Sequence, residues 1–124
     1  MERRHEEVDR SIRAITDLSH HEQRVLSDLR QEIARRSRGL HVRMTVFGSR
    51  ARGDAEADSD MDVLLEVETD HLAFPDKQRL RQIASEVSLA SGIIVSLLVV
   101  DRQIMKERGD FSLFDNIRDE GIAV

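Results

Sequence analysis

The apolar positions near the start of the chain predict an amphipathic helix. Val8, Ile12 and Ile15 lie four and then three residues apart, and Leu18 follows three residues later. This spacing places the four side chains on one face of a helix whose other residues are mostly charged. We therefore expect a helical extension over residues 1–18, with its apolar stripe packed either against a partner or second copy, or into the domain's own core.

A second helix is predicted to begin directly after Ser19. The sequence SHHE, from Ser19 to Glu22, has the spacing of a capping box, in which the serine accepts from the backbone three residues on and the glutamate reaches back. The apolar stripe of this helix comprises Val25, Leu26, Leu29 and Ile33. The helix is expected to end near Gly39, because glycine readily adopts the left-handed conformation typical of helix C-termini.

Three later segments have the patterns of β-strands. Apolar and polar residues alternate over residues 42–46, which predicts a half-buried strand that runs into Gly48. Residues 61–68 are rich in apolar and β-branched side chains and predict a second strand. The continuous apolar run over residues 93–100 predicts a third strand, buried on both faces.

Helices are predicted on both sides of the third strand. Before it, a helix follows Pro75 and ends at Gly92, because proline favours the first turn of a helix and glycine its end. The apolar face of this helix comprises Leu80, Ile83, Ala84 and Val87. After the strand, the tail predicts one or two short helices, with apolar anchors at Phe111, Leu113, Phe114 and Ile117.

Length, charge and cysteine content limit the classes of function. The 124 residues fit one domain, residues 1–124, and 35% of them are charged. A net charge of −5 argues against a general nucleic-acid binder, which needs a basic surface. The chain has no cysteine, which suits the cytoplasm, and its longest apolar run is far shorter than the roughly 20 residues of a membrane helix. We expect a cytoplasmic protein without a membrane span.

Candidate chemistry is concentrated in the stretch FGSRARGDAEADSDMDV, residues 47–63. A Gly48-Ser49 corner between a strand and a helix-like RARG can hold phosphate, because the glycine backbone, the serine hydroxyl and free amides approach an anion. An ordinary tight turn has the same pattern. Asp60 and Asp62 lie two residues apart, so both point to the same side of a strand and could bind a hard cation such as Mg²⁺. Alternatively, they form an acidic loop end that faces water.

The combination of the two halves is more specific than either. Gly48-Ser49, ten residues, and then Asp60-Met61-Asp62 match the G-S-x10-D-x-D signature of the nucleotidyltransferase superfamily that includes DNA polymerase β. In detail the chain resembles the minimal nucleotidyltransferases (MNT), because FGSRARG, SDMDVLL and the C-terminal NIRDEGIAV are close to the characteristic sequence motifs of that family. The resemblance covers roughly residues 22–124. It implies an α+β fold with a small mixed β-sheet flanked by helices.

The resemblance also implies roles for individual residues. Asp60 and Asp62 are expected to be catalytic and to bind Mg²⁺, which bridges the phosphates and activates an acceptor hydroxyl. The residues expected to bind the nucleotide, ATP, are Gly48, Ser49, Arg50, Arg52 and Ser59. In this assignment the two arginines help to neutralise the triphosphate, and Ser59 makes a backbone or hydroxyl contact.

One position departs from the family pattern. Relatives carry a third carboxylate on a later strand, and where many read VDLV this chain reads VSLL, with Ser96 at the position of the acid. A hydroxyl does not replace a carboxylate as a metal ligand or a base without a large loss. The nearest downstream acid is Asp101, whose strand parity is opposite. The chain therefore works with two carboxylates, takes an acid from elsewhere, or has lost catalysis.

The resemblance also suggests a partner. Minimal nucleotidyltransferases commonly occur beside an all-helical HEPN toxin, and some transfer AMP from ATP to a tyrosine of that toxin. The leading interpretation is therefore a HEPN/MNT antitoxin that modifies its toxin, with a homo-oligomer left open. An antitoxin that neutralises its partner by binding alone is the alternative that Ser96 favours. Transfer to a small molecule such as an aminoglycoside normally needs a further substrate-binding domain, which this length does not supply.

Overall fold

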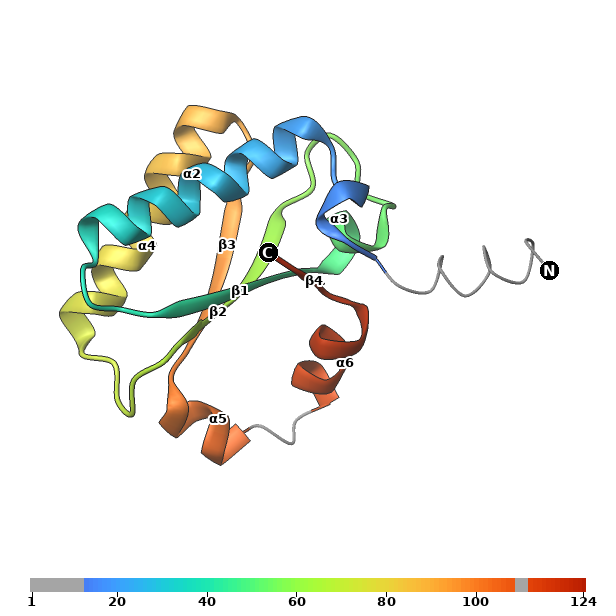
Figure 1. The fold of residues 1–124 in the computed structure, drawn as a ribbon. Coiled ribbons are helices and arrows are strands. Elements are labelled where there is room, and N and C mark those ends of the chain that lie inside the picture. The colour runs from blue at the N-terminus through green and yellow to red at the C-terminus, as the bar shows by residue number, and fades with distance from the viewer. Residues whose placement is uncertain (1–12, 109–111) are drawn as a thin grey trace.

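The structure, a computed structural model, describes residues 13–108 and 112–124. Three residues used above, Val8, Ile12 and Phe111, lie outside this part of the chain. The elements follow in the order η1–α2–β1–α3–β2–α4–β3–α5–α6–β4 (Figure 1). Within residues 13–108 and 112–124, no helix is both long and apolar enough to cross a bilayer.

The centre of the described fold is a four-stranded sheet in the order β3-β2-β1-β4. The strands are β1 (Val42–Phe47), β2 (Met61–Val67), β3 (Val95–Val100) and β4 (Ile122–Ala123). β1 is antiparallel to both β2 and β4, whereas β2 and β3 are parallel. The expected α+β fold, with a small mixed sheet flanked by helices, is confirmed (Figure 1).

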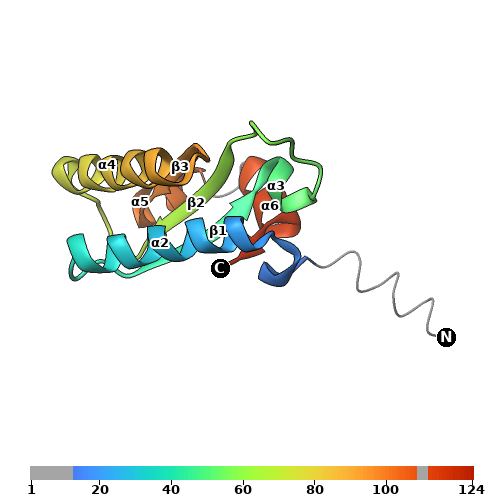
Figure 2. The ribbon, with the colours of Figure 1, turned by 90° about the horizontal axis from the view of Figure 1, so that it is seen from above.

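Two long helices, α2 (His20–Arg36) and α4 (Phe74–Ser91), cover one face of the sheet (Figures 1 and 2). The predicted capping box is present: the Ser19 hydroxyl accepts from the Glu22 amide at 3.0 Å, and the Glu22 carboxylate accepts from the Ser19 amide at 2.8 Å. The predicted stripes of both helices are buried, namely Val25, Leu26, Leu29, Ile33, Leu80, Ile83, Ala84 and Val87. Burying a large aliphatic side chain contributes about 1.5–3 kcal/mol, which holds these helices on the sheet.

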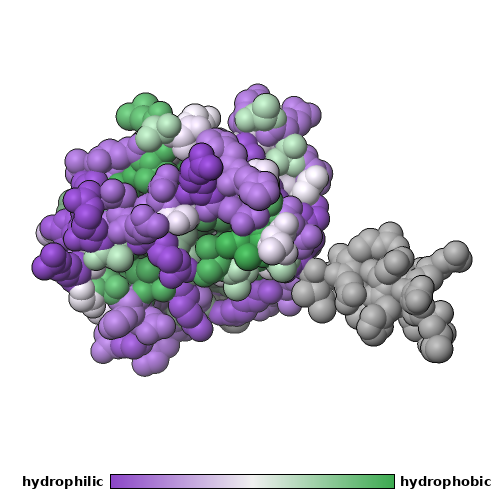
Figure 3. Space-filling view, turned by 45° about the horizontal axis from the view of Figure 1, so that its top comes forward, coloured by the Kyte–Doolittle hydropathy of each residue, from purple (hydrophilic) through white to green (hydrophobic). Residues whose placement is uncertain are grey.

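Two shorter helices, α5 (Arg102–Arg108) and α6 (Ser112–Glu120), follow β3, and their apolar residues pack with the opposite face of the sheet. A second core cluster there comprises Leu64, Val100, Phe114 and Ile117. The predicted anchors Phe114 and Ile117 are thus confirmed. The prediction that Leu113 is an anchor is wrong, because its position on α6 leaves its side chain 48% exposed. On the side seen in Figure 3, the surface is mostly hydrophilic, with hydrophobic residues showing between the polar ones.

The prediction of a helix through Leu18 is wrong for the described part of that segment. Only Ile15–Asp17 is helical, as the single 3-10 turn η1, and Leu18 has extended backbone angles. The reason is the capping box that follows, because an N-cap serine requires non-helical backbone at its own position. Leu18 is 4% exposed and joins the domain's own core, whereas Ile15 is 36% exposed.

The third strand is present, but the prediction that it is buried on both faces is wrong. β3 has only β2 as a neighbour in the described sheet, and its middle is open: Ser96 is exposed, and Leu97 and Leu98 are half-buried. Its two ends are buried, at Val95 and at Val99 and Val100. Since β3 is an edge strand, apolar content alone overstates how much of it is covered.

The sequence pattern does not predict β4, which has only two residues and depends on pairing with β1. Gly121 precedes it where the chain passes very close to its neighbours. A Cβ at this position would lie 2.3 Å from the Ile117 carbonyl oxygen and 2.4 Å from Thr45 Cγ2. A glycine therefore permits the approach that forms this edge of the sheet.

Candidate functional site

β1 runs directly into the short helix α3 (Gly48–Arg52), and the junction is a sharp corner at Gly48. Gly48 has φ +75°, in the left-handed region that favours glycine. A Cβ here would lie 2.4 Å from Asp62 Oδ2, so the Gly48-Ser49 corner lies directly against that carboxylate. The structure thus brings the two halves of the predicted motif together, although they are separated by ten residues in the sequence.

Because side chains alternate between the two faces of β2, Asp62 lies on the face of the sheet away from α2 and α4. Its neighbours Met61 and Val63 are fully buried in the core beneath those helices. Asp62 itself is half-buried and pairs in register with Phe47, the last residue of β1. Asp60 is exposed and immediately precedes the strand. Both predicted carboxylates therefore lie at the end of the sheet that carries the glycine corner.

The two carboxylates interact unfavourably with each other. Burial raises the pKa of Asp62 above its ordinary value, and the negative charge of Asp60 raises it further, while the charge of Arg52 opposes the shift. A divalent cation held by Asp60 and Asp62 would relieve this repulsion, and carboxylate oxygens are ligands that a hard cation such as Mg²⁺ prefers. Neither here nor elsewhere among residues 13–108 and 112–124 is a group of three or more His, Asp or Glu residues arranged to hold a metal ion.

Asp62→Asn is expected to stabilise the folded protein by about 0.5 kcal/mol at neutral pH. Because the folded pKa lies above the unfolded value of about 3.9, ionising Asp62 costs stability as pH rises through the window between the two values. The cost is complete above the folded pKa and absent below the unfolded one. Thermal unfolding of both proteins across this range measures the effect. The idea is wrong if the variant is no more stable than the parent at neutral pH.

Of the two arginines predicted to contact the triphosphate, Arg52 lies at the surface near Asp62. Its side chain is 49% exposed, and its charge acts on Asp62. Its Nε lies 3.4 Å from Asp54 Oδ2, a weak surface contact that an incoming phosphate can replace. The predicted role of Arg52 stays a prediction, and its position is consistent with it.

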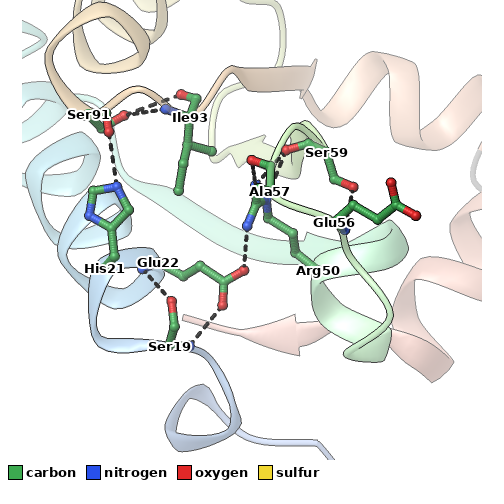
Figure 4. Close-up of polar contacts among 9 residues, drawn as sticks. All are labelled: Ser19, His21, Glu22, Arg50, Glu56, Ala57, Ser59, Ser91 and Ile93. Carbon is green, nitrogen blue, oxygen red and sulfur yellow. Dashed lines mark hydrogen bonds and ion pairs between the residues drawn. The ribbon is translucent and has the colours of Figure 1, made fainter.

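Arg50 points into the protein instead, where its side chain is 8% exposed (Figure 4). Its Nη1 donates to Glu22 Oε2 at 2.9 Å. Its Nε and Nη2 both donate to the Ser59 carbonyl oxygen, at 3.0 and 2.7 Å, and Nη2 also lies 3.4 Å from the Ala57 carbonyl oxygen. Because these acceptors occupy the guanidinium, the structure does not bring Arg50 to the predicted triphosphate site.

Ser59 also takes part in contacts within the protein. Its hydroxyl accepts from the Glu56 amide at 2.9 Å, and its carbonyl is the acceptor for Arg50 (Figure 4). These bonds shape the loop between α3 and β2. A contact between Ser59 and a nucleotide stays a prediction.

The departure at Ser96 lies at the site itself. Ser96 is the register partner of Asp62 on the parallel strand β3, so both side chains project from the same face of the sheet. Asp101 lies just past the other end of β3, where its carboxylate accepts from the Leu72 and Ile104 amides at 2.8 and 2.9 Å. Burial would raise the pKa of Asp101, but these two hydrogen bonds outweigh it and hold the pKa below its ordinary value. Asp101 therefore anchors the start of α5 and does not replace a third carboxylate.

Sequence reasoning assigns Glu22 only to the capping box and misses its contact with Arg50. Burial would raise the pKa of Glu22, but hydrogen bonds from the Ser19 amide and from Arg50 outweigh it, so the pKa lies below its ordinary value. The two partners are 28 positions apart, and local periodicity carries no signal over that separation. Only the fold reveals the pair.

Comparison with known proteins agrees with this geometry. A family model described as "Nucleotidyltransferase domain" matches residues 26–123. One protein of Methanocaldococcus jannaschii, named "Putative protein adenylyltransferase", is 29% identical over 100 residues, which cover 81% of this chain and 95% of that protein. A second protein of the same name and organism is 23% identical over 100 residues, with coverage of 81% and 94%. No solved structure matches the chain significantly.

The family match spans both the glycine corner and the aspartate pair that the fold brings together. The predicted resemblance to the nucleotidyltransferase superfamily is confirmed at this level. The chain belongs to the nucleotidyltransferase domain family.

Proposed function

We propose that this protein transfers AMP from ATP, with Mg²⁺, to a hydroxyl of a partner protein. The observation that carries the proposal is the contact between the Gly48-Ser49 corner and Asp62, with Asp60 at the same end of the sheet. Family membership supports nucleotidyl transfer in general. The names of the two relatives favour a protein over a small molecule as the acceptor.

In this proposal each residue has a distinct task. Asp60 and Asp62 hold Mg²⁺, which when bound neutralises phosphate charge and activates the acceptor hydroxyl. The backbone of the Gly48-Ser49 corner and the Ser49 hydroxyl bind the triphosphate, and the Arg52 guanidinium pairs with its oxygens. The acceptor oxygen bonds to the α-phosphorus as pyrophosphate leaves, and the acceptor proton passes to solvent.

We infer that the acceptor is a tyrosine of a HEPN toxin and that the chain acts as its antitoxin. The support is the resemblance to minimal nucleotidyltransferases together with the protein-modifying names of the relatives. The chain contains no tyrosine, so any AMP found on tyrosine in a mixture with the partner belongs to the partner. This composition makes the acceptor simple to identify.

Neutralisation by binding alone is the second candidate, and one observation favours it. Ser96 lies in register with Asp62, where relatives have a third carboxylate, and a hydroxyl supplies neither a negative charge nor a strong base. If two carboxylates do not suffice, the same fold would bind its partner without modifying it.

Mass spectrometry separates the two candidates. The purified chain is incubated with ATP, Mg²⁺ and a HEPN protein shown to bind it, and the intact masses are measured. We expect the HEPN protein to gain one AMP, which peptide analysis locates on a tyrosine. An adduct eliminates the binding-only candidate. Failure to form any adduct against a confirmed partner overturns the proposed transfer.

Ser96→Asp is expected to raise transfer about 10-fold, or to create it if the parent is inactive. The new carboxylate would lie in register with Asp62 and add a metal ligand or base. Ser96→Asn is the matched control, because it has nearly the same size but no charge, and it should not raise transfer. The rate of AMP addition is measured for all three proteins. Equal rates for the aspartate and asparagine variants would contradict the proposed role of this position.

A further inference from the structure

The loop that carries Asp60 has few apolar anchors. It connects α3 to β2, and Asp54, Glu56, Ala57 and Asp58 are all exposed. A metal-binding carboxylate needs a fixed backbone, because coordination tolerates little displacement. Polar contacts must therefore set the position of this loop.

Asp60 is held from both sides through its neighbours. On one side, the Ser59 carbonyl shares a planar peptide unit with the Asp60 amide, and Arg50 donates two hydrogen bonds to that carbonyl, at 3.0 and 2.7 Å. On the other side, the Met61 amide donates to the Ile94 carbonyl oxygen at 2.8 Å. Arg50 thus provides the anchor on the loop side.

The Arg50 guanidinium is itself fixed by the start of α2. Glu22 uses one carboxylate oxygen to accept from the Ser19 amide and the other to accept from Arg50 Nη1 at 2.9 Å (Figure 4). The side chains of Glu22 and Arg50 are 12% and 8% exposed, so solvent weakens the pair little. The planar guanidinium of Arg50 donates to several acceptors in fixed positions, and together these bonds fix the orientation of its side chain.

We propose that Glu22 and Arg50 form a clamp that positions Asp60 for the binding of a divalent cation with a nucleoside triphosphate. The clamp rests on the function proposed above and assigns both members as positioning residues. The clamp also gives the two arginines of the motif different roles, because Arg50 holds the loop whereas Arg52 is proposed to pair with the phosphates. A clamp that served the fold alone would affect stability without a specific effect on the loop or the site.

Arg50→Lys is the principal variant. Lysine keeps the positive charge near Glu22, but its single nitrogen cannot bond to Glu22 and donate twice to the Ser59 carbonyl in the same geometry. We expect Mg²⁺ and a non-hydrolysable ATP analogue to bind about 10-fold more weakly, as for other partners that orient metal ligands. We also expect faster hydrogen exchange at the amides of Ser59 and Met61, which donate to the Glu56 and Ile94 carbonyl oxygens on the two sides of Asp60. Calorimetry and exchange measured by NMR give the two readouts.

Arg36→Lys is the matched control. Arg36 lies on α2, as Glu22 does, and forms a two-bond ion pair with Glu86 at 2.8 and 3.2 Å, but that pair ties α2 to α4 and not to the loop. This variant should leave both the nucleotide affinity and the exchange of the Ser59 and Met61 amides unchanged. An Arg50→Lys protein that matches the Arg36→Lys protein in both readouts overturns the clamp.

A second variant covers the case in which Arg50→Lys does not fold. Glu22→Gln retains an acceptor for the capping box, while its neutral amide holds Arg50 less firmly. We expect a smaller loss of affinity, about 3-fold, and faster exchange at the Ser59 and Met61 amides than in the Arg36→Lys control. If the parent protein binds no metal–nucleotide complex, the proposed function fails. Exchange then still decides the clamp: faster exchange only in the Glu22 or Arg50 variants supports it, and unchanged exchange overturns it.

Discussion

Asp62→Ala is expected to lower AMP transfer by at least about 10³-fold, the largest effect of any single substitution considered for this chain. Asp62 is one of the two carboxylates assigned to the proposed metal site, and Ser96 beside it supplies no third. Losing Asp62 leaves Asp60 alone of this pair. Transfer to the proposed HEPN partner is measured by mass spectrometry, and the affinity for Mg²⁺ with an ATP analogue by calorimetry.

Binding to the partner should survive this substitution, because Asp62 is half-buried and lies at the proposed nucleotide site. Asp58→Ala provides the control: it removes an exposed carboxylate from the same stretch of chain without touching the site. That variant should transfer AMP at the parent rate. Full transfer by the Asp62→Ala protein, or equal losses in both variants, would show that Asp62 has no specific role.

Gly48→Ala is expected to destabilise the protein and also to disrupt the metal site. An alanine at φ +75° costs about 1–3 kcal/mol in backbone strain. Its Cβ would lie 2.4 Å from Asp62 Oδ2, so the carboxylate must move out of the position in which it faces the corner. We expect at least about a 10-fold loss of affinity for Mg²⁺ with an ATP analogue. Denaturant unfolding and calorimetry measure the two effects.

Gly39→Ala separates strain from collision. Gly39 has φ +87°, but a Cβ there would meet no atom within 4 Å. It should therefore show the backbone cost without any loss of nucleotide binding. In an Asp62→Ala background the colliding carboxylate is absent, so Gly48→Ala should there cost no more stability than Gly39→Ala. If Gly48→Ala and Gly39→Ala lowered the free energy of unfolding of the parent equally, the proposed collision with Asp62 would be contradicted.

Local patterns predicted the elements whose cause is local. The capping box from Ser19 to Glu22 marked the start of α2 correctly, because its two hydrogen bonds join residues three apart. Helical stripes predicted the buried faces of α2 and α4, since the 3.6-residue period applies wherever a helix covers a core. The spacing from Gly48 to Asp62 predicted that the glycine corner and Asp62 lie together, and the structure confirms this closeness, because β1 and β2 pair in register beside the corner.

The errors arise where distant parts of the chain decide the outcome. β3 reads as a fully buried strand, yet it is an edge strand, because strand order is not encoded in its own residues. β4 forms only through pairing with β1, which the close approach at Gly121 permits. The helix expected through Leu18 is reduced to one 3-10 turn in its described part, because the following cap imposes an extended entry.

The sequence by itself determined the family, the two carboxylates and the glycine corner of this protein, because these depend on residue types at short, fixed spacings. The tertiary structure alone decided which of the two motif arginines is buried and which stays at the surface. Arg50 and Arg52 are two residues apart in one motif, yet Arg50 is buried against Glu22 and the Ser59 carbonyl, whereas Arg52 stays exposed near Asp62. The physical reason is that a charged side chain takes its role from the acceptors that the fold places around it.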